Sequence, residues 1–190
     1  MATLLRPALT LLIAFSLITG LAYPLLTTGI ARLVFPYQAA GSLIERDGKT
    51  VGSLLIGQGF SDPKYFWSRP SATSPMPYNP QASGGSNLGP LNPALMEAVK
   101  GRIDALHAAD PGNTTTIPAD LVYSSASGLD PHISLAAALY QAGRISRVRH
   151  LPIEKVQQLI SEYSEGMLLG FLGEPRVNVL ALNLALDAAH

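Results

Sequence analysis

Three serines, an aspartate and a histidine lie close together in the chain, and these residue types can perform nucleophilic catalysis. They are Ser124, Ser125, Ser127, Asp130 and His132. In a hydrolase, histidine takes the proton of the serine hydroxyl and a carboxylate orients the histidine. A nucleophile elbow needs glycine two positions away on both sides, which none of these serines has. Asp130, followed by Pro131, fits a helix start better than a catalytic acid.

A second candidate is a run of small residues that could bind a phosphate group. The run consists of Ser83, Gly84, Gly85, Ser86 and Asn87. Consecutive small residues can turn backbone N–H groups towards an anion. No Gly-Lys-Ser/Thr follows, so the run is not a P-loop. We keep it as a candidate nucleotide contact beside the simpler interpretation of a structural turn.

Composition argues against metal, thiol and nucleic-acid chemistry. The four histidines show no ligand spacing, and the absence of cysteine excludes thiol catalysis, thiolate metal sites and disulfides. From residue 32 onwards the chain carries twelve basic and thirteen acidic side chains. It therefore has no basic field for nucleic acid. We predict no catalytic residue, no metal site and no tightly bound cofactor.

An uncharged stretch near the N-terminus determines where the rest of the chain lies, because it is long enough to span a membrane. Between Arg6 and Arg32, residues 7–31 include no charged side chain. At about 1.5 Å per residue, a helix of this length covers about 37 Å, against roughly 30 Å for the hydrocarbon core of a bilayer. We expect a stub of residues 1–6, a transmembrane helix over 7–31 and one compact domain over 32–190.

The residues in and around this helix bear on its orientation and on its contacts. Arg6 favours a cytoplasmic N-terminus by the positive-inside rule. A cleaved signal peptide is the alternative, because Gly20-Leu21-Ala22 has the small-x-small pattern of a cleavage site. The apolar run continues beyond that point and Pro24 would hinder processing, so the sequence favours an anchor. Ser16 and Gly20 form a small-xxx-small pair that could receive another transmembrane helix, although small residues are common in spanning helices.

Residues 59–93 form the most informative stretch of the remaining chain. Seven prolines and four glycines preclude a regular helix or strand there. The segment also carries aromatic residues that a disordered linker would lack, among them Tyr65, Phe66, Trp67 and Tyr78. We predict an ordered loop that is either functional or packed over the core.

Regular elements are expected on both sides of this loop. Residues 41–58 predict a β-hairpin, because Asp47-Gly48 suits a type I′ turn. Three helices are expected to begin at Asn92-Pro93, Asp130-Pro131 and Pro152. The C-terminal stretch 174–190 starts with β-branched residues and ends as a helix. The predicted fold is a single N-terminal transmembrane helix followed by one small mixed α/β (α+β) soluble domain.

Four blocks of sequence indicate a family. They are Arg6-Pro7-Ala8-Leu9 leading to Tyr23-Pro24-Leu25-Leu26-Thr27-Thr28, Ser68-Arg69-Pro70-Ser71-Ala72, Tyr78-Asn79-Pro80-Gln81-Ala82-Ser83-Gly84-Gly85-Ser86-Asn87-Leu88, and Ser125-Ala126-Ser127-Gly128-Leu129-Asp130. With the C-terminal Val177-Asn178-Val179 and the following Leu182-Asn183-Leu184-Ala185-Leu186, they resemble the C chain of the Kdp potassium-transporting ATPase. The resemblance runs nearly end to end.

This resemblance implies an accessory subunit of a bacterial inner-membrane complex that imports potassium at the expense of ATP. Its partners would be a channel-like chain that binds potassium and a P-type ATPase chain. The family's C chain is anchored by one helix, is needed for assembly, and has been described as a chaperone that raises the ATP affinity of the ATPase chain. The sequence has no Asp-Lys-Thr-Gly-Thr phosphorylation motif and no complete filter motif, so it is neither the ATPase nor the pore.

The expected orientation places Gly84 and its neighbours in the periplasm, where ATP is not supplied. We therefore expect any effect on ATP to act through the partner, with direct ATP contact at residues 83–87 as the alternative. The residues expected to dock on partner subunits are Trp67, Arg69, Pro70, Tyr78 and Asn79 in the loop, with Ser16 and Gly20 in the anchor. Two other functions stay open, a membrane-anchored periplasmic scaffold and a hydrolase unrelated to a pump.

Overall fold

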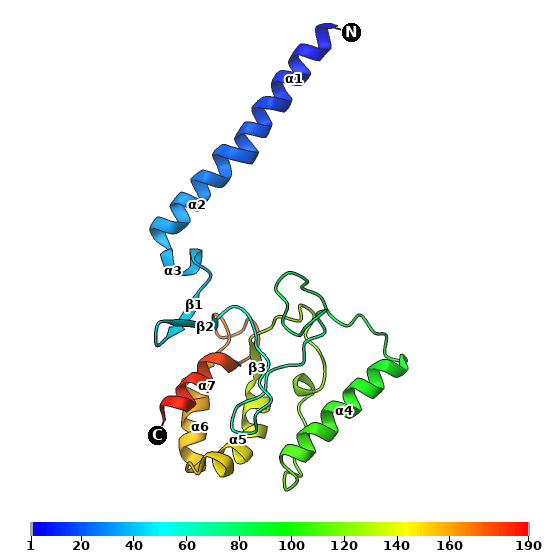
Figure 1. The fold of residues 1–190 in the computed structure, drawn as a ribbon, viewed down its shortest axis with the longest axis vertical. Helices are drawn as coiled ribbons and strands as arrows, with labels where there is room; N and C mark the ends of the chain where they lie inside the picture. The colour runs from blue at the N-terminus through cyan, green and yellow to red at the C-terminus, as the bar shows by residue number, and fades with distance from the viewer. Residues whose placement is uncertain (1, 190) are drawn as a thin grey trace. The chain divides into compact units, whose positions relative to one another are not determined.

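The computed structural model describes residues 2–189 of the chain, which divides into two compact units, Met1–Val51 and Gly52–His190. In the first unit one helix runs without interruption through α1 (Ala2–Leu17), the π-helical turn η1 (Ile18–Ala22) and α2 (Tyr23–Val34) (Figure 1). The stretch Thr3–Val34 is long and apolar enough to cross a membrane. The prediction of one long apolar N-terminal helix is therefore confirmed.

Pro24 accounts for the π-helical turn. Proline has no N–H, so the carbonyl of Gly20 lacks the donor that would normally lie four residues later. The helix widens just before this point, and the N–H of Tyr23 donates to the carbonyl of Ile18. The hydroxyl of Thr27 also donates to the carbonyl of Tyr23, at 2.9 Å. The helix thus passes the proline without breaking.

The predicted hairpin is confirmed. A short helix, α3 (Pro36–Ala39), precedes β1 (Leu43–Arg46) and β2 (Lys49–Ser53), which pair as a two-stranded sheet. The connecting Asp47 and Gly48 have φ of 53° and 73°. Positive φ at both central positions is the requirement of the type I′ turn.

The second unit combines three packed helices with a small antiparallel sheet. The helices are α5 (Leu135–Arg149), α6 (Ile153–Glu162) and α7 (Val179–Ala188). The sheet has the order β3-β5-β4, with β3 at His132–Ser134, β4 at Ser164–Glu165 and β5 at Arg176–Asn178. Two strands lead directly into capped helices. Ser134 Oγ accepts the N–H of Ala137 at 3.0 Å, and Asn178 Oδ1 accepts that of Ala181 at 3.1 Å.

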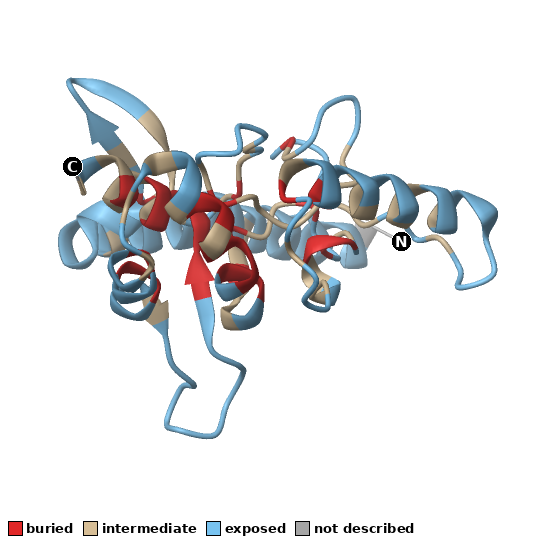
Figure 2. Ribbon diagram, turned by 90° about the horizontal axis from the view of Figure 1, so that it is seen from below, coloured by how far each residue is buried: buried red, intermediate tan, exposed pale blue. Residues whose placement is uncertain are grey.

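The hydrophobic core of this unit lies among these helices and strands, where Figure 2 shows the buried residues gathered. Its largest fully buried apolar side chains are Phe66, Ile133, Ile145, Val156, Ile160, Val177, Val179, Leu182 and Leu186. Burial of each contributes about 1.5–3 kcal/mol. Phe66 belongs to the proline-rich loop, so that loop is part of the core and not a covering added to it.

The helix starts confirm the sequence expectations except at one point. Helix α4 (Pro93–Ala109) begins as predicted, with Asn92 Oδ1 accepting the N–H of Ala94 at 3.0 Å, and α6, β5 and α7 also match. A 3-10 turn, η2, follows at Ala119–Leu121. The helix start expected at Asp130-Pro131 is wrong. The chain stays extended there because β3 pairs with β5, and Ser134 caps the helix instead.

Candidate functional site

Two side-chain amides fasten the proline-rich loop to the helices of the core. Asn183 on α7 accepts the N–H of Phe66 at 2.9 Å and donates to its carbonyl at 3.0 Å. Gln141 on α5 does the same for Trp67, accepting at 2.7 Å and donating at 3.1 Å. Each amide thus satisfies both backbone groups of one loop residue, as a neighbouring strand would. The loop gains a sheet-like attachment without containing a strand.

Arg144 on α5 also contacts this part of the loop. It donates to the carbonyl of Pro63 and, at 3.1 Å, to that of Tyr65. Its guanidinium lies 4.8 Å from the centre of the Trp67 ring, which adds a cation–π contact. Burial lowers the pKa of Arg144 to about 10. Loop carbonyls and an aromatic face therefore solvate this buried cation.

Arg149, five residues further along α5, makes similar contacts at the loop edge. It donates to the carbonyl of Lys64 at 2.8 Å and pairs with Asp187 on α7 at 2.7 Å. Its guanidinium lies 4.9 Å from the centre of the Tyr65 ring, whose hydroxyl also donates to Asp187 at 3.1 Å. Residues 63–67 are thereby held in one conformation.

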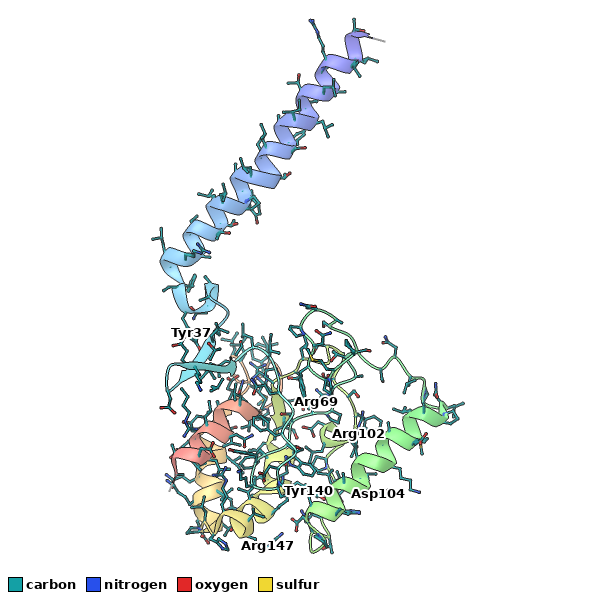
Figure 3. The ribbon with its side chains drawn as sticks, in the orientation of Figure 1. Tyr37, Arg69, Arg102, Asp104, Tyr140 and Arg147 are labelled. Atoms are coloured by element: carbon teal, nitrogen blue, oxygen red, sulfur yellow. The ribbon has the colours of Figure 1, made fainter. Side chains whose placement is uncertain are left out.

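The remainder of the loop meets the segment before β3, and we call residues 68–87 together with 124–130 the loop cluster. Its central ion pair joins Arg69 Nη1 to Asp130 Oδ2 at 2.9 Å. Figure 3 labels Arg69 among the side chains of this unit. Burial raises the pKa of Asp130, but hydrogen bonds from His132 and Arg69 outweigh it and bring the pKa to about 2. Asp130 is therefore an ionised structural anchor. Its other oxygen accepts the N–H of His132 at 3.0 Å.

Hydroxyl groups hold the turn between residues 71 and 79. Ser71 Oγ donates to the carbonyl of Gly128 at 2.7 Å and accepts the N–H of Tyr78 at 2.9 Å. Thr73 Oγ1 accepts the N–H of Asn79 at 3.0 Å, and the Tyr78 hydroxyl donates to the carbonyl of Arg69. Burial raises the pKa of Tyr78, so its hydroxyl stays protonated as this donor requires.

The small residues considered for phosphate binding pack against the other half of the loop cluster. The N–H of Gly84 and the hydroxyl of Ser83 both donate to the carbonyl of Ser127, at 2.8 and 3.0 Å. A Cβ on Gly85 would lie 3.1 Å from the carbonyl oxygen of Ala126. Close packing therefore accounts for this glycine, and the N–H of Gly84 is already used within the chain.

The serines considered for catalysis are also used structurally. Ser125 Oγ accepts the N–H of Gly128 at 3.0 Å, and Ser127 Oγ accepts that of Leu129 at 3.1 Å. Ser124 Oγ accepts a hydrogen bond from Arg102 at 3.1 Å. Among residues 2–189, no hydrogen bond joins one of these hydroxyls to His132, whose Nδ1 lies 3.5 Å from Asp130 Oδ1. The arrangement suits loop turns, not a serine nucleophile with its base.

The structure places the predicted docking residues in three settings. Arg69, Pro70, Tyr78 and Asn79 come together in the loop cluster, and Trp67 lies on Arg144 beside it. Ser16 and Gly20 lie on the long N-terminal helix, where both are exposed and a Cβ on Gly20 would meet nothing within 4 Å. Sequence reasoning missed Gln141 and Asn183. The available signal was only an amide side chain among apolar neighbours, which does not identify the loop backbone as its partner.

Comparison with known proteins covers almost the whole chain. The family model described as "KdpC: K+-transporting ATPase, c chain" matches residues 5–188. The potassium-transporting ATPase KdpC subunit of Polaromonas naphthalenivorans (strain CJ2) is 69% identical over 188 residues, covering 99% of this chain and 96% of that protein. Those of Variovorax paradoxus (strain S110) and Dechloromonas aromatica (strain RCB) are 65% and 64% identical, covering 100% and 99% of this chain and 98% of each relative.

Proposed function

Because the chain belongs to the family of potassium-transporting ATPase C chains, we propose that it is the non-catalytic accessory subunit of an ATP-driven potassium importer. Its partners would be the channel-like subunit that binds potassium and the P-type ATPase subunit. Its role would be to hold the assembled complex together and to raise the ATP affinity of the ATPase subunit.

The observation that supports this proposal most is the fixed conformation of a long loop without regular elements. Its backbone is held at Phe66 and Trp67 by core amides and further along by the Arg69–Asp130 pair. A loop that is already ordered loses little conformational entropy on docking. The exposed tip of the loop, residues 74–77, includes Met76, which is 57% exposed. We propose this face as the contact with a partner subunit, with Trp67, Arg69, Pro70, Tyr78 and Asn79 behind and beside it.

The effect on ATP follows from the same contact. If docking favours the conformation of the ATPase subunit that binds ATP better, the two events are coupled without ATP touching this chain. The coupling is reciprocal, so ATP should also tighten the docking. ATP binding by the purified chain alone, abolished by replacing Gly84 and Gly85 with bulky residues, would instead favour direct contact at residues 83–87.

The docking proposal can be tested with matched methionine variants in the complete complex. Met76→Asp introduces a charge at the loop tip, and Met96→Asp introduces the same charge on α4, where Met96 is 64% exposed. We expect Met76→Asp to lower co-purification with a tagged ATPase subunit, because a carboxylate buried in an apolar contact is unfavourable. Met96→Asp should leave recovery unchanged. Equal recovery of both variants and the wild type would contradict the proposed contact.

The proposed orientation places residues 32–190 in the periplasm of a bacterial inner membrane, with the N-terminus in the cytoplasm. The chain has no cysteine, so a single introduced thiol reports on its own position. Cysteines at Ser74 and Thr115, which are both exposed, should react with a membrane-impermeant thiol reagent in intact spheroplasts. Labelling only after lysis would overturn this orientation.

A further inference from the structure

The loop between β4 and β5 exposes a cluster of large apolar side chains that the candidate site does not include. Five such residues within this loop are 45–76% exposed, namely Met167, Leu168, Leu169, Phe171 and Leu172. Figure 2 shows the exposed loop extending from the buried part of β5. Single exposed apolar residues are ordinary, but a contiguous group marks a surface that another molecule covers. We call residues 166–173 the hairpin tip.

Backbone hydrogen bonds give the hairpin tip a defined conformation. The N–H of Leu168 donates to the carbonyl of Leu172 and the N–H of Leu172 donates to that of Leu168, both at 2.9 Å. At the base of the hairpin, Arg176 pairs with Glu165 at 2.9 Å. These contacts fix the direction in which the apolar side chains project. A fixed apolar projection can enter a complementary recess with little loss of conformational entropy.

Leu169 indicates that the apolar surface is needed for more than folding. Its φ is 55°, a left-handed conformation that bulky residues rarely adopt and that glycine or asparagine would adopt more easily. Its side chain is 76% exposed, so it contributes little to the core. A strained backbone conformation therefore places an exposed leucine at this point.

Charge around the hairpin tip selects among the surfaces that could cover it. Peripheral binding to a membrane surface typically relies on lysine and arginine beside the apolar residues. Here the flanking charges are Glu165, Glu174 and Arg176, and Arg176 is already paired with Glu165. Among residues 2–189, no ion pair neutralises Glu174. The flank is therefore net acidic, which suits a protein surface with a basic rim better than a lipid bilayer.

We propose that the hairpin tip docks into an apolar recess, rimmed by basic side chains, on another subunit of the same ATPase. This rests on the proposed accessory function and adds a second contact, separate in sequence from the loop cluster. Leu169 and Phe171 are the central anchors, because they are the two most exposed of the five apolar residues, at 76% and 71%. Glu174 faces the basic rim.

The test uses the complete chain expressed with the other subunits, the complex being captured through a tag on the ATPase subunit. The double variant Leu169→Asn with Phe171→Ser should lower recovery of this chain at least about tenfold. Asparagine tolerates positive φ, so Leu169→Asn by itself should not lower the thermal stability of the chain. The matched control is Leu91→Asn, at a leucine that is 94% exposed outside the hairpin, and it should leave recovery unchanged.

Labelling of a cysteine introduced at the hairpin tip distinguishes a contact with another subunit from a contact with lipid. Leu169→Cys should be labelled rapidly in the purified chain alone, both in detergent and in phosphatidylethanolamine vesicles, and be protected in the complex. Protection in vesicles without other subunits would overturn the inference in favour of a lipid contact. Normal recovery of the double variant would overturn it while leaving the proposed function standing. Failure of the wild-type chain to co-purify with any subunit would instead refute the proposed function, and this inference with it.

Discussion

Asn183→Leu should release the proline-rich loop from the core. Asn183 is 2% exposed, and its amide satisfies both the N–H and the carbonyl of Phe66. Leucine has the same branching at Cγ and is somewhat larger, so the change removes the hydrogen bonds without leaving a cavity. It leaves two buried backbone groups without partners.

The expected cost follows from those two groups. An unsatisfied buried polar group costs about 1–3 kcal/mol, so the free energy of unfolding should fall by about 2–6 kcal/mol. For a unit of this size, a loss of 3 kcal/mol corresponds to a fall in Tm of roughly 10 °C. A cap residue provides the comparison. Asn92→Ala removes the exposed N-cap of α4 and should cost only about 1 kcal/mol.

Two measurements on the full chain in detergent would check this expectation. Thermal unfolding gives the loss of stability, and amide hydrogen exchange shows where it acts. Exchange at Phe66 and Trp67 should rise more in Asn183→Leu than in Asn92→Ala, because only the first variant frees the loop. A Tm within about 1 °C of the wild type, with unchanged exchange at Phe66, would refute the idea that the amide clamp orders the loop.

Four further variants test the ion pair of the loop cluster, the anchor helix and the proposed docking surface. Asp130→Asn should cost about 1 kcal/mol near neutral pH. The depressed pKa of Asp130, about 2, adds stability that is present above the ordinary carboxyl pKa of about 4 and is lost as pH falls towards 2, so the variant should flatten acid unfolding in that window. Gly20→Leu should lower recovery of the complex without affecting membrane insertion, because leucine keeps helices apart; unchanged co-purification would leave Ser16 and Gly20 as ordinary anchor residues. Trp67→Ala and Arg69→Ala should each weaken assembly or potassium-stimulated ATPase activity of the whole complex, measured after detergent extraction, and full activity in both would remove them from the docking surface.

Elements set by local chemistry could be predicted from the sequence. The turn at Asp47-Gly48 depends on positive φ at two adjacent positions, and the start of α4 depends on Asn92 and Pro93 alone. The strand β3 was missed, because three residues become a strand only through pairing with β5, whose partners are more than forty positions away. Asp130 therefore looked like a helix cap when its carboxylate in fact pairs with Arg69.

In the candidate site, too, local features could be predicted from the sequence and distant contacts could not. The proline content and aromatic residues predicted an ordered loop, yet its attachment depends on contacts across 74 and 117 positions of sequence, from Gln141 and Asn183. No local pattern identifies such partners. The hairpin tip was overlooked for the opposite reason. A run of leucines and a phenylalanine normally indicates core, and only the structure reveals that residues 167–172 are exposed.

We propose above that this chain serves the potassium-transporting ATPase as an accessory subunit without turnover of its own. The most direct measurement compares the complex purified with and without this chain, for subunit composition, potassium-stimulated ATPase activity and KM for ATP. We expect the complex lacking the chain to dissociate, or to require a higher ATP concentration, and we expect the added full chain to restore it. Identical composition, activity and KM in both preparations would contradict the proposed accessory role.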